Sequence, residues 1–246
     1  MPASNHSQLP LRPGVVADCT GALWLAASSA LLIADAHLGY AWAQRRRGEL
    51  GPLTDGGIVA RLRSVLDRWK PARVVFLGDV VHLGTPSAEE QSLIEETLTE
   101  VIAHTEVFVV LGNHDRRFEE DFGHLGLRTG ESWEDDGVLA VHGDKEWPST
   151  AKLLVVGHLH PAVSLEDAVG ARQKLPVFAM GERALVLPAF SPFAAGFDVR
   201  KPLPAEWQQL FGEEEVELAA ITGTQVRRIP LGLSLRYRPP GEPARG

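Results

Sequence analysis

The stretch LLIADAH, residues 31–37, ends a run of apolar residues with an aspartate and a histidine. The same arrangement recurs four times along the chain, at VVFLGDVVH (74–82), FVVLGNHD (108–115), LAVHGD (139–144) and LVVGHLH (154–160). Each apolar run predicts a strand that is buried on both faces. Aspartate, asparagine and histidine supply oxygen and nitrogen ligands for divalent metals. One such motif carries little weight, but the ordered series predicts a metal centre at the ends of several strands.

The segments between these runs predict an α/β fold. Apolar residues at helical spacing predict one helix over 58–69 and a second that includes 93–102. Ser87 and Glu90 have the spacing of a capping box at the start of the second helix. Because strands of one α/β domain bring their carboxyl ends to a common rim, we expect the motif side chains to meet there. Other strands are expected at 22–27, 177–179 and 185–187, with a strand pair at a sheet edge within 219–231.

Composition narrows the class of protein. The chain has 246 residues and a formal net charge of −8, which argues against a protein that coats nucleic acid through a broad basic face. The single cysteine, Cys19, excludes an intramolecular disulfide framework. No apolar run approaches the roughly 18 residues that span a bilayer, and the first residues lack the features of a secretory signal. We therefore expect a cytoplasmic protein without membrane contact, folded as one domain over 1–246 with flexible ends at 1–14 and 238–246.

The motifs resemble those of the calcineurin-like metallophosphoesterase superfamily, which follow the order D-x-H, G-D-x-x, G-N-H-[DE], a single histidine and G-H-x-H. All five occur in this order between Asp35 and His160. The resemblance implies a single metallophosphoesterase domain, a four-layer α/β/β/α sandwich of two mixed sheets with the site on the rim loops. It also implies two divalent metal ions that share one bridging aspartate. One ion would be held by Asp35, His37, Asp79 and His160, and the other by Asp79, Asn113, His142 and His158.

A narrower resemblance is to the metallophosphoesterases encoded beside a DNA ligase and a helicase in bacterial nucleic-acid-repair clusters. It covers about residues 29–200 and is carried by ADAHLGY (34–40), RRRG (45–48), GHLHP (157–161) and LPAF (187–190). That family's activity implies a manganese-dependent phosphodiesterase or single-strand DNA endonuclease. It further implies a functional association with a ligase and a helicase.

The mechanism that we expect is direct attack by metal-activated water on phosphorus. Two metals about 3.5–4 Å apart can lower the pKa of a bridging water and neutralise charge on the phosphate. His114 fits the superfamily position that contacts phosphate and protonates the leaving oxygen, and Asp115 would orient its ring. His82, Arg116 and Arg46 are the candidate substrate contacts.

Several alternatives stay open at this stage. The substrate could be a small nucleotide or a nucleotide-linked lipid precursor, although no membrane-facing insertion is evident in the sequence. A non-catalytic scaffold in a repair complex would lack metal binding, whereas here every expected ligand is present. Mixed histidine and carboxylate sites bind zinc, iron or nickel as well as manganese. The sequence leaves the native metal and the oligomeric state undetermined.

Overall fold

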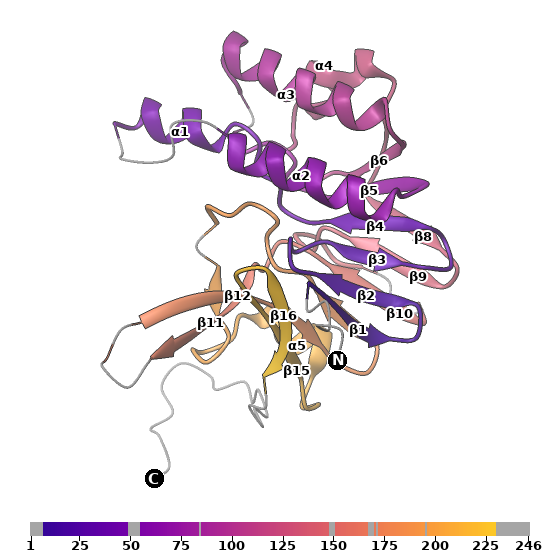
Figure 1. The fold of residues 1–246 in the computed structure, drawn as a ribbon, viewed down its shortest axis with the longest axis vertical. Helices are drawn as coiled ribbons and strands as arrows, with labels where there is room; N and C mark the ends of the chain where they lie inside the picture. Colours follow the sequence, from indigo (N-terminus) through magenta and orange to yellow (C-terminus); the bar gives the residue numbers. More distant parts are fainter. Residues whose placement is uncertain are drawn as a thin grey trace, which may run out of the picture.

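The computed structural model describes residues 7–48, 55–83, 85–147, 151–166, 170, 172–194 and 196–229 (Figure 1). The helices are α1 (Tyr40–Arg46), α2 (Gly56–Trp69), α3 (Ala88–Ile102), α4 (Phe118–Phe122), the 3-10 helix η1 (Gly123–Leu125) and α5 (Ala205–Phe211). The strands are β1 (Gln8–Arg12), β2 (Val15–Asp18), β3 (Leu23–Leu25), β4 (Ala30–Ile33), β5 (Arg73–Leu77), β6 (Glu106–Val110), β7 (Arg128–Gly130), β8 (Ser132–Asp135), β9 (Val138–Val141), β10 (Leu153–Val156), β11 (Pro161–Glu166), β12 (Arg172–Met180), β13 (Ala184–Val186), β14 (Phe197–Asp198), β15 (Glu217–Thr222) and β16 (Gln225–Ile229). Within the described ranges, no helix is long and apolar enough to cross a membrane.

The strands form two mixed sheets. The first has the order β1-β2-β3-β4-β5-β6-β7, with β4 through β7 parallel to one another. The second has the order β14-β11-β12-β13-β10-β9-β8, and β15 and β16 add to it alongside β12. In the second sheet β9, β10 and β13 are parallel. Each sheet therefore has a group of parallel strands whose carboxyl ends share one edge.

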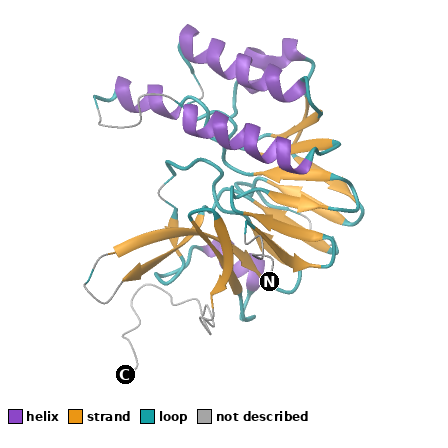
Figure 2. Cartoon of the chain, in the orientation of Figure 1, coloured by secondary structure: helices purple, strands orange, loops and turns teal. Residues whose placement is uncertain are grey.

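Three apolar clusters hold four layers together. Alternation along β5 shows the principle, because Val74 and Phe76 face the helices while Val75 and Leu77 face the other sheet. Helices α2 and α3 cover the outer face of the first sheet (Figure 2). On the far side, Trp207 of α5 packs on the outer face of the second sheet. The predicted α/β/β/α sandwich is confirmed.

Several predicted elements form with small shifts of their ends. The first predicted helix is α2, and Ser87 and Glu90 make the expected capping box at the start of α3, with bonds of 3.3 Å and 2.6 Å between side chain and backbone. The predicted edge pair is β15 with β16. Residues beyond 229, including the end of that predicted pair, lie outside the described residues.

The amino-terminal segment differs from the expected flexible end. Gln8–Arg12 forms β1 and pairs with β2 in antiparallel register, from Gln8 opposite Asp18 to Arg12 opposite Val15. The side chain of Leu11 is buried between the sheets, so apolar burial holds this edge strand in place. Residues 1–6 and 238–246 lie outside the described residues. The interpretation of residues 1–246 as one domain stays a prediction.

A buried aspartate fastens β2 to the carboxyl end of α2. Asp18 is fully buried, and its carboxylate accepts hydrogen bonds from Arg68 at 2.6 Å, from the indole of Trp69 at 2.9 Å and from the hydroxyl of Thr20 at 2.8 Å. Several charge-assisted bonds therefore converge on one carboxylate.

We expect Asp18→Asn to lower the free energy of unfolding by about 2–3 kcal/mol, because Arg68 loses its charged partner in a buried setting. Urea denaturation measures the change. The control is Glu100→Gln, which removes the solvent-facing ion pair with Arg63 and should leave the unfolding midpoint unchanged. Equal effects of the two substitutions would contradict the prediction.

Candidate metal centre

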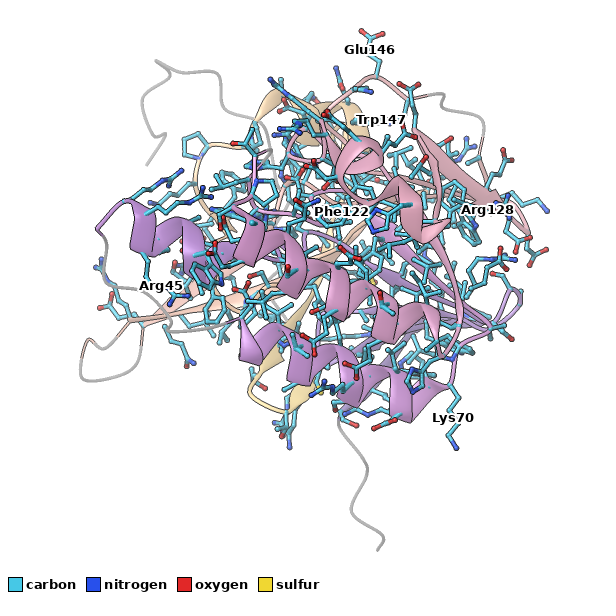
Figure 3. The ribbon with its side chains drawn as sticks, turned by 90° about the horizontal axis from the view of Figure 1, so that it is seen from above. Arg45, Lys70, Phe122, Arg128, Glu146 and Trp147 are labelled. Carbon is cyan, nitrogen blue, oxygen red and sulfur yellow. The ribbon has the colours of Figure 1, made fainter. Side chains whose placement is uncertain are left out.

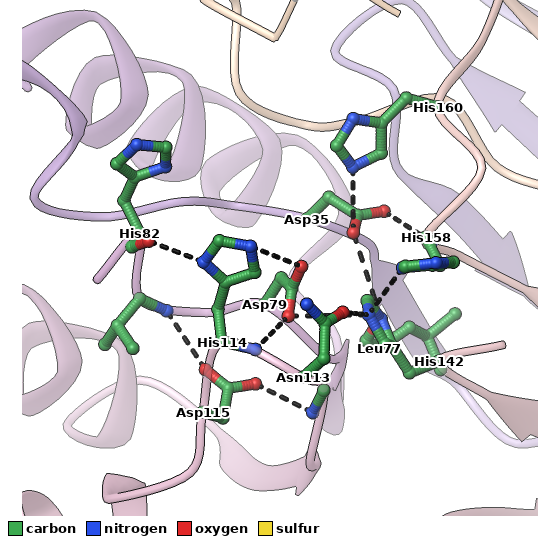
Figure 4. Close-up of polar contacts among 12 residues, drawn as sticks. Asp35, Leu77, Asp79, His82, Asn113, His114, Asp115, His142, His158 and His160 are labelled. Atoms are coloured by element: carbon green, nitrogen blue, oxygen red, sulfur yellow. Dashed lines mark hydrogen bonds and ion pairs between the residues drawn. The ribbon is translucent and has the colours of Figure 1, made fainter. Parts of the chain in front are cut away.

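The carboxyl ends of the parallel strands of both sheets meet in one cluster of polar side chains (Figure 4). Asp35 follows β4, Asp79 follows β5 and Asn113 follows β6. From the second sheet, His142 follows β9 and His158 follows β10. A hydrogen bond links the ends of β10 and β4, since the backbone amide of His158 donates to the side-chain Oδ2 of Asp35 at 2.9 Å.

One half of the cluster is centred on His142. Its Nδ1 lies 2.9 Å from the carbonyl oxygen of Leu77, which fixes the ring and turns Nε2 toward the cluster. Nε2 lies 3.2 Å from Asn113 Oδ1, 3.4 Å from Asp79 Oδ1 and 3.2 Å from His158 Nδ1. These atoms are all potential electron-pair donors. Such crowding suits a shared cation.

The other half contains Asp35, His37 and His160. Asp35 Oδ1 lies 3.0 Å from His160 Nε2, and the rings of His37 and His160 are 5.3 Å apart. Ligand atoms of these three residues all lie within 4.8 Å of one another. Asp79 joins both halves, because its carboxylate belongs to one such group with His142 and His158 and to another with His37 and His114. The structure thus brings together all seven sequence-predicted metal ligands.

The backbone at the cluster adopts a conformation that L-residues rarely take. Positive φ is seen at Asp35, His37, Asp79, His158 and His160, with values between 43° and 59°. Non-glycine residues avoid this region, and its use is concentrated at functional sites. The left-handed turns direct the side chains inward as the chain leaves each strand. Tertiary packing therefore maintains local strain at the predicted ligands.

Charge at the cluster is arranged for a cation. Burial lowers the pKa of His142, but its hydrogen bond to Asp79 and the charge of Asp35 outweigh burial and raise this pKa to about 9. For Asp79 burial acts to raise the pKa, since it again disfavours the charged form, but the hydrogen bond and charge of His142 lower this pKa to about 2. Burial lowers the pKa of His37 to about 4, so this imidazole is neutral and able to coordinate at neutral pH.

Buried polar atoms in this cluster fit bound metal. Asp35 Oδ1, His37 Nδ1 and His160 Nε2 are buried without a hydrogen bond of good geometry within the described residues, although Asp35 Oδ1 and His160 Nε2 lie 3.0 Å apart. Leaving such atoms unsatisfied costs free energy, and natural proteins rarely do so without a ligand. The donor set of carboxylate, amide and imidazole matches divalent metals. The residues present therefore fit the metals that the motifs imply.

His114 and Asp115 lie beside the cluster, and their polar contacts differ in kind. His114 Nδ1 lies 2.6 Å from the carbonyl oxygen of His82, and its amide donates to Asp79 Oδ1 at 2.9 Å. Among the described residues, no hydrogen bond joins the Asp115 carboxylate to that ring. The carboxylate instead accepts from the backbone amides of Val81 at 3.2 Å and Gly112 at 3.0 Å, and burial raises its pKa to about 6. The expectation that Asp115 orients the His114 ring stays a prediction, and the hydrogen bonds of this carboxylate come from two backbone amides.

A pocket of about 300 Å³ opens beside the cluster. His82 lines it, as expected of a substrate contact. Burial lowers the pKa of this imidazole to about 4, with the charges of His37 and His114 adding to the effect. The full lining is His37, Tyr40, Asp79, His82, Asn113, His114, His158, His160, Phe193 and Ala194.

The two predicted arginine contacts do not line this pocket. Arg46 is paired at 2.8 Å with Glu90, whose side chain is only 1% exposed, so it ties α1 to α3. Its neighbour Arg45, which is labelled in Figure 3, lies on the same short helix. The guanidinium carbon of Arg45 is 4.2 Å from the centre of the Trp42 ring. Arg116 is exposed on the loop before α4. Tyr40 and Phe193 line the pocket instead, and neither is among the sequence-predicted contacts, although Tyr40 ends the segment ADAHLGY (34–40).

The fold and this site define a metal-dependent phosphoesterase. The family model of the calcineurin-like phosphoesterases matches residues 29–186, and the chain belongs to this family. It is accordingly a hydrolase that works with divalent metals. No curated protein matches the chain at a significant level of sequence similarity.

Solved structures with the same fold include the nuclease MPE of Pseudomonas putida, which is 21% identical, with a TM-score of 0.68 over 92% of this chain and 100% of the other. Vps29 of Entamoeba histolytica with bound zinc is 15% identical, with a TM-score of 0.36 over 81% and 96% of the two chains. A conserved Streptococcus pneumoniae protein, described as a predicted phosphoesterase, is 16% identical with a TM-score of 0.29 over 82% and 92%. At these sequence identities a structural match supports the fold alone. Of the three, only the Pseudomonas putida nuclease has a TM-score high enough to support it.

Proposed function

We propose that the chain is a dinuclear, manganese-dependent phosphodiesterase that cuts single-stranded DNA internally. The observation that carries the proposal is the position of Asp79, whose carboxylate belongs to two adjacent ligand groups beside a pocket. A carboxylate shared by two adjacent ligand groups can bridge a pair of divalent ions.

The two halves of the cluster support the two ligand sets that the family resemblance implies. Bound there, the ions would supply a low-pKa water and positive charge opposite the phosphate oxygens. The protein's own contribution is to hold the ligands in place through the strand ends and the strained turns. One ion would be bound by Asp35, His37, Asp79 and His160, and the other by Asp79, Asn113, His142 and His158.

His114 is proposed as the group that protonates the leaving oxygen. Because Nδ1 donates its proton to the His82 carbonyl, Nε2 is the nitrogen that gains and loses a proton on the pocket side. Nε2 lies 3.9 Å from Asp79 Oδ2, which places it beside the shared ligand. Asp115 acts indirectly, by fixing the loop at Val81 and Gly112 next to this ring.

A nucleic-acid substrate is supported by the likeness to the Pseudomonas putida nuclease, which covers nearly the whole of both chains. The net charge of −8 fits local contact at a metal site better than broad binding of duplex DNA. Work beside a DNA ligase and a helicase in the cytoplasm, as in a repair pathway, belongs to the same proposal. Hydrolysis of a small nucleotide or a nucleotide-linked lipid is the alternative that the experiment must exclude.

The test is cleavage of an end-labelled single strand and its duplex, with manganese and with EDTA. Internal cuts in the single strand that require manganese support the nuclease. Intact DNA together with metal-dependent hydrolysis of a small phosphodiester would reject the nuclease and retain the phosphodiesterase. Replacing manganese with zinc, iron or nickel in the same assay identifies the preferred metal.

His114→Ala should lower kcat by about 100-fold, because the leaving oxygen loses its proton donor. Metal content should stay at two ions per chain, since His114 is not one of the proposed ligands. Steady-state kinetics with metal analysis measures both. His124→Ala is the matched control, because His124 is exposed and pairs with Glu95 away from the site. Loss of metal from His114→Ala would make His114 a ligand and contradict the proposed role.

A further inference from the structure

Two aromatic rings form one wall of the pocket beside the metal centre. Tyr40, the first residue of α1, and Phe193, from the loop after β13, stack on each other with ring centres 5.4 Å apart and planes 19° apart. Both line the pocket together with His114 and His160. The centres of the His82 and Tyr40 rings are 4.7 Å apart, with their planes inclined at 61°, so His82 continues the wall toward the cluster. An apolar surface thus borders a group of charged and polar ligands.

Short backbone links anchor Tyr40 to the metal centre. The amide of Tyr40 donates to the carbonyl of His37 at 3.2 Å. The carboxylate of Asp55, at the start of α2, accepts from the flanking amides of Gly39 at 2.6 Å and Ala41 at 3.0 Å. These bonds fix the turn from which the ring projects.

The loop that carries Phe193 is hydrogen-bonded to the chain just after β4, close to Asp35. The amide of Phe190 donates to Ala34 at 2.8 Å, and the amide of Ser191 donates to the carbonyl of Asp35 at 3.2 Å. Phe193 follows within two residues, with its amide on the hydroxyl of Ser191 at 3.4 Å. The two rings come from distant parts of the chain, yet each is held within a few residues of a proposed ligand. Their position relative to a phosphate at the cluster is therefore defined.

We propose that Tyr40 and Phe193 form a stacking wall for the nucleobase next to the phosphate that is cleaved. A phosphate group alone gains nothing from aromatic rings, whereas a base attached to it offers a flat π-face that stacks on them. A single strand leaves its bases free for this contact, and a duplex does not. The wall rests on the proposed phosphodiesterase and narrows its substrates to nucleotide esters.

Two small substrates isolate the base. Thymidine 5′-(p-nitrophenyl phosphate) and methyl p-nitrophenyl phosphate are both singly charged diesters with the same leaving group, and they differ in the nucleoside. The wild-type enzyme should favour the thymidine ester in kcat/KM. Tyr40→Leu and Phe193→Leu should each lower this preference about 10-fold, mainly through KM for the thymidine ester. Tyr40→Phe should keep the preference, because the ring remains.

The control is Trp24→Leu, which removes one ring of the stacked pair Trp24–Trp69, a pair that does not line the pocket. It should leave the preference unchanged. Melting temperatures of all variants verify that the fold is intact. A wild-type enzyme without preference for the thymidine ester would overturn the proposal, and so would an equal loss for both esters in the leucine variants.

The experiment separates the wall from the nuclease. If single-stranded DNA stays intact but the preference for the thymidine ester holds and depends on the rings, the nuclease is wrong and the wall stands. If neither ester is hydrolysed, the preference can be measured by binding instead. Calorimetry in manganese should then show tighter binding of thymidine 5′-monophosphate than of methyl phosphate. Equal affinity for these two ligands would then reject the wall.

Discussion

Asp79→Ala is expected to lower kcat/KM for a phosphodiester by about 10⁴-fold, the largest effect of any single substitution in this chain. The physical reason is that Asp79 takes part in both ligand groups, so its removal weakens the binding of both ions at once. Its carboxylate is also the acceptor for the amide of His114 at 2.9 Å, which places the proposed proton donor. Metal analysis should show a fall from two ions per chain to one or none.

Asp144→Ala is the matched control for this substitution. Asp144 lies two residues after His142 in the same motif, is exposed, and belongs to none of the ligand groups among the described residues. The control removes the same charge close to the site and should retain two ions and nearly full activity. Manganese should raise the melting temperature of the control and of the wild type, but much less that of Asp79→Ala. Full metal content in Asp79→Ala would contradict the shared-ligand arrangement.

The metal centre could be predicted because its information is local. A ligand at the end of a buried strand is marked by residue type and by the apolar run before it, as with Asp35 after β4. Parallel strands then bring such ends together whatever the loops between them do. The main fold elements were predictable for the same reason, since α2 has apolar residues at helical spacing and β5 is a continuous apolar run.

The pocket wall depends on contacts that no local pattern encodes. Tyr40 and Phe193 are distant in sequence and meet only because Ser191 and Phe190 pair with the end of β4. Asp115 shows a related limit: it adjoins His114 in the chain, yet its carboxylate accepts from the backbone amides of Val81 and Gly112. Residues that are adjacent in sequence lie in the same loop, but their side chains can point in different directions. Strand β1 escaped prediction because a single buried leucine gives little alternation in five residues.

The second large effect is expected from adding one methyl group at Gly112, a glycine beside the proposed ligands. A Cβ added to Gly112 would overlap Asp79 Oδ1, would lie 2.5 Å from the Asp79 amide and would lie 2.9 Å from the ring of His142. Real Cβ atoms do not approach so closely, so the backbone or the ligands must move. Both neighbours are proposed ligands of one ion, and the obstruction includes backbone, which cannot turn aside as a long side chain can.

Gly112→Ala should therefore lower kcat/KM by about 10³-fold, although Gly112 contributes no ligand. A displacement of about 1 Å at reacting groups already lowers the rate about 10²-fold, and here the metal ligands are displaced as well. Overpacking should also lower the free energy of unfolding by about 1–3 kcal/mol. Gly123→Ala is the control, since a Cβ there meets nothing within 4 Å and its φ is not positive. Kinetics, metal analysis and urea denaturation of the two variants decide the matter. An active Gly112→Ala enzyme with two bound ions would contradict the prediction. It would show that the cluster tolerates movement of Asp79 and that close packing around this carboxylate is not required for the geometry of the metal centre.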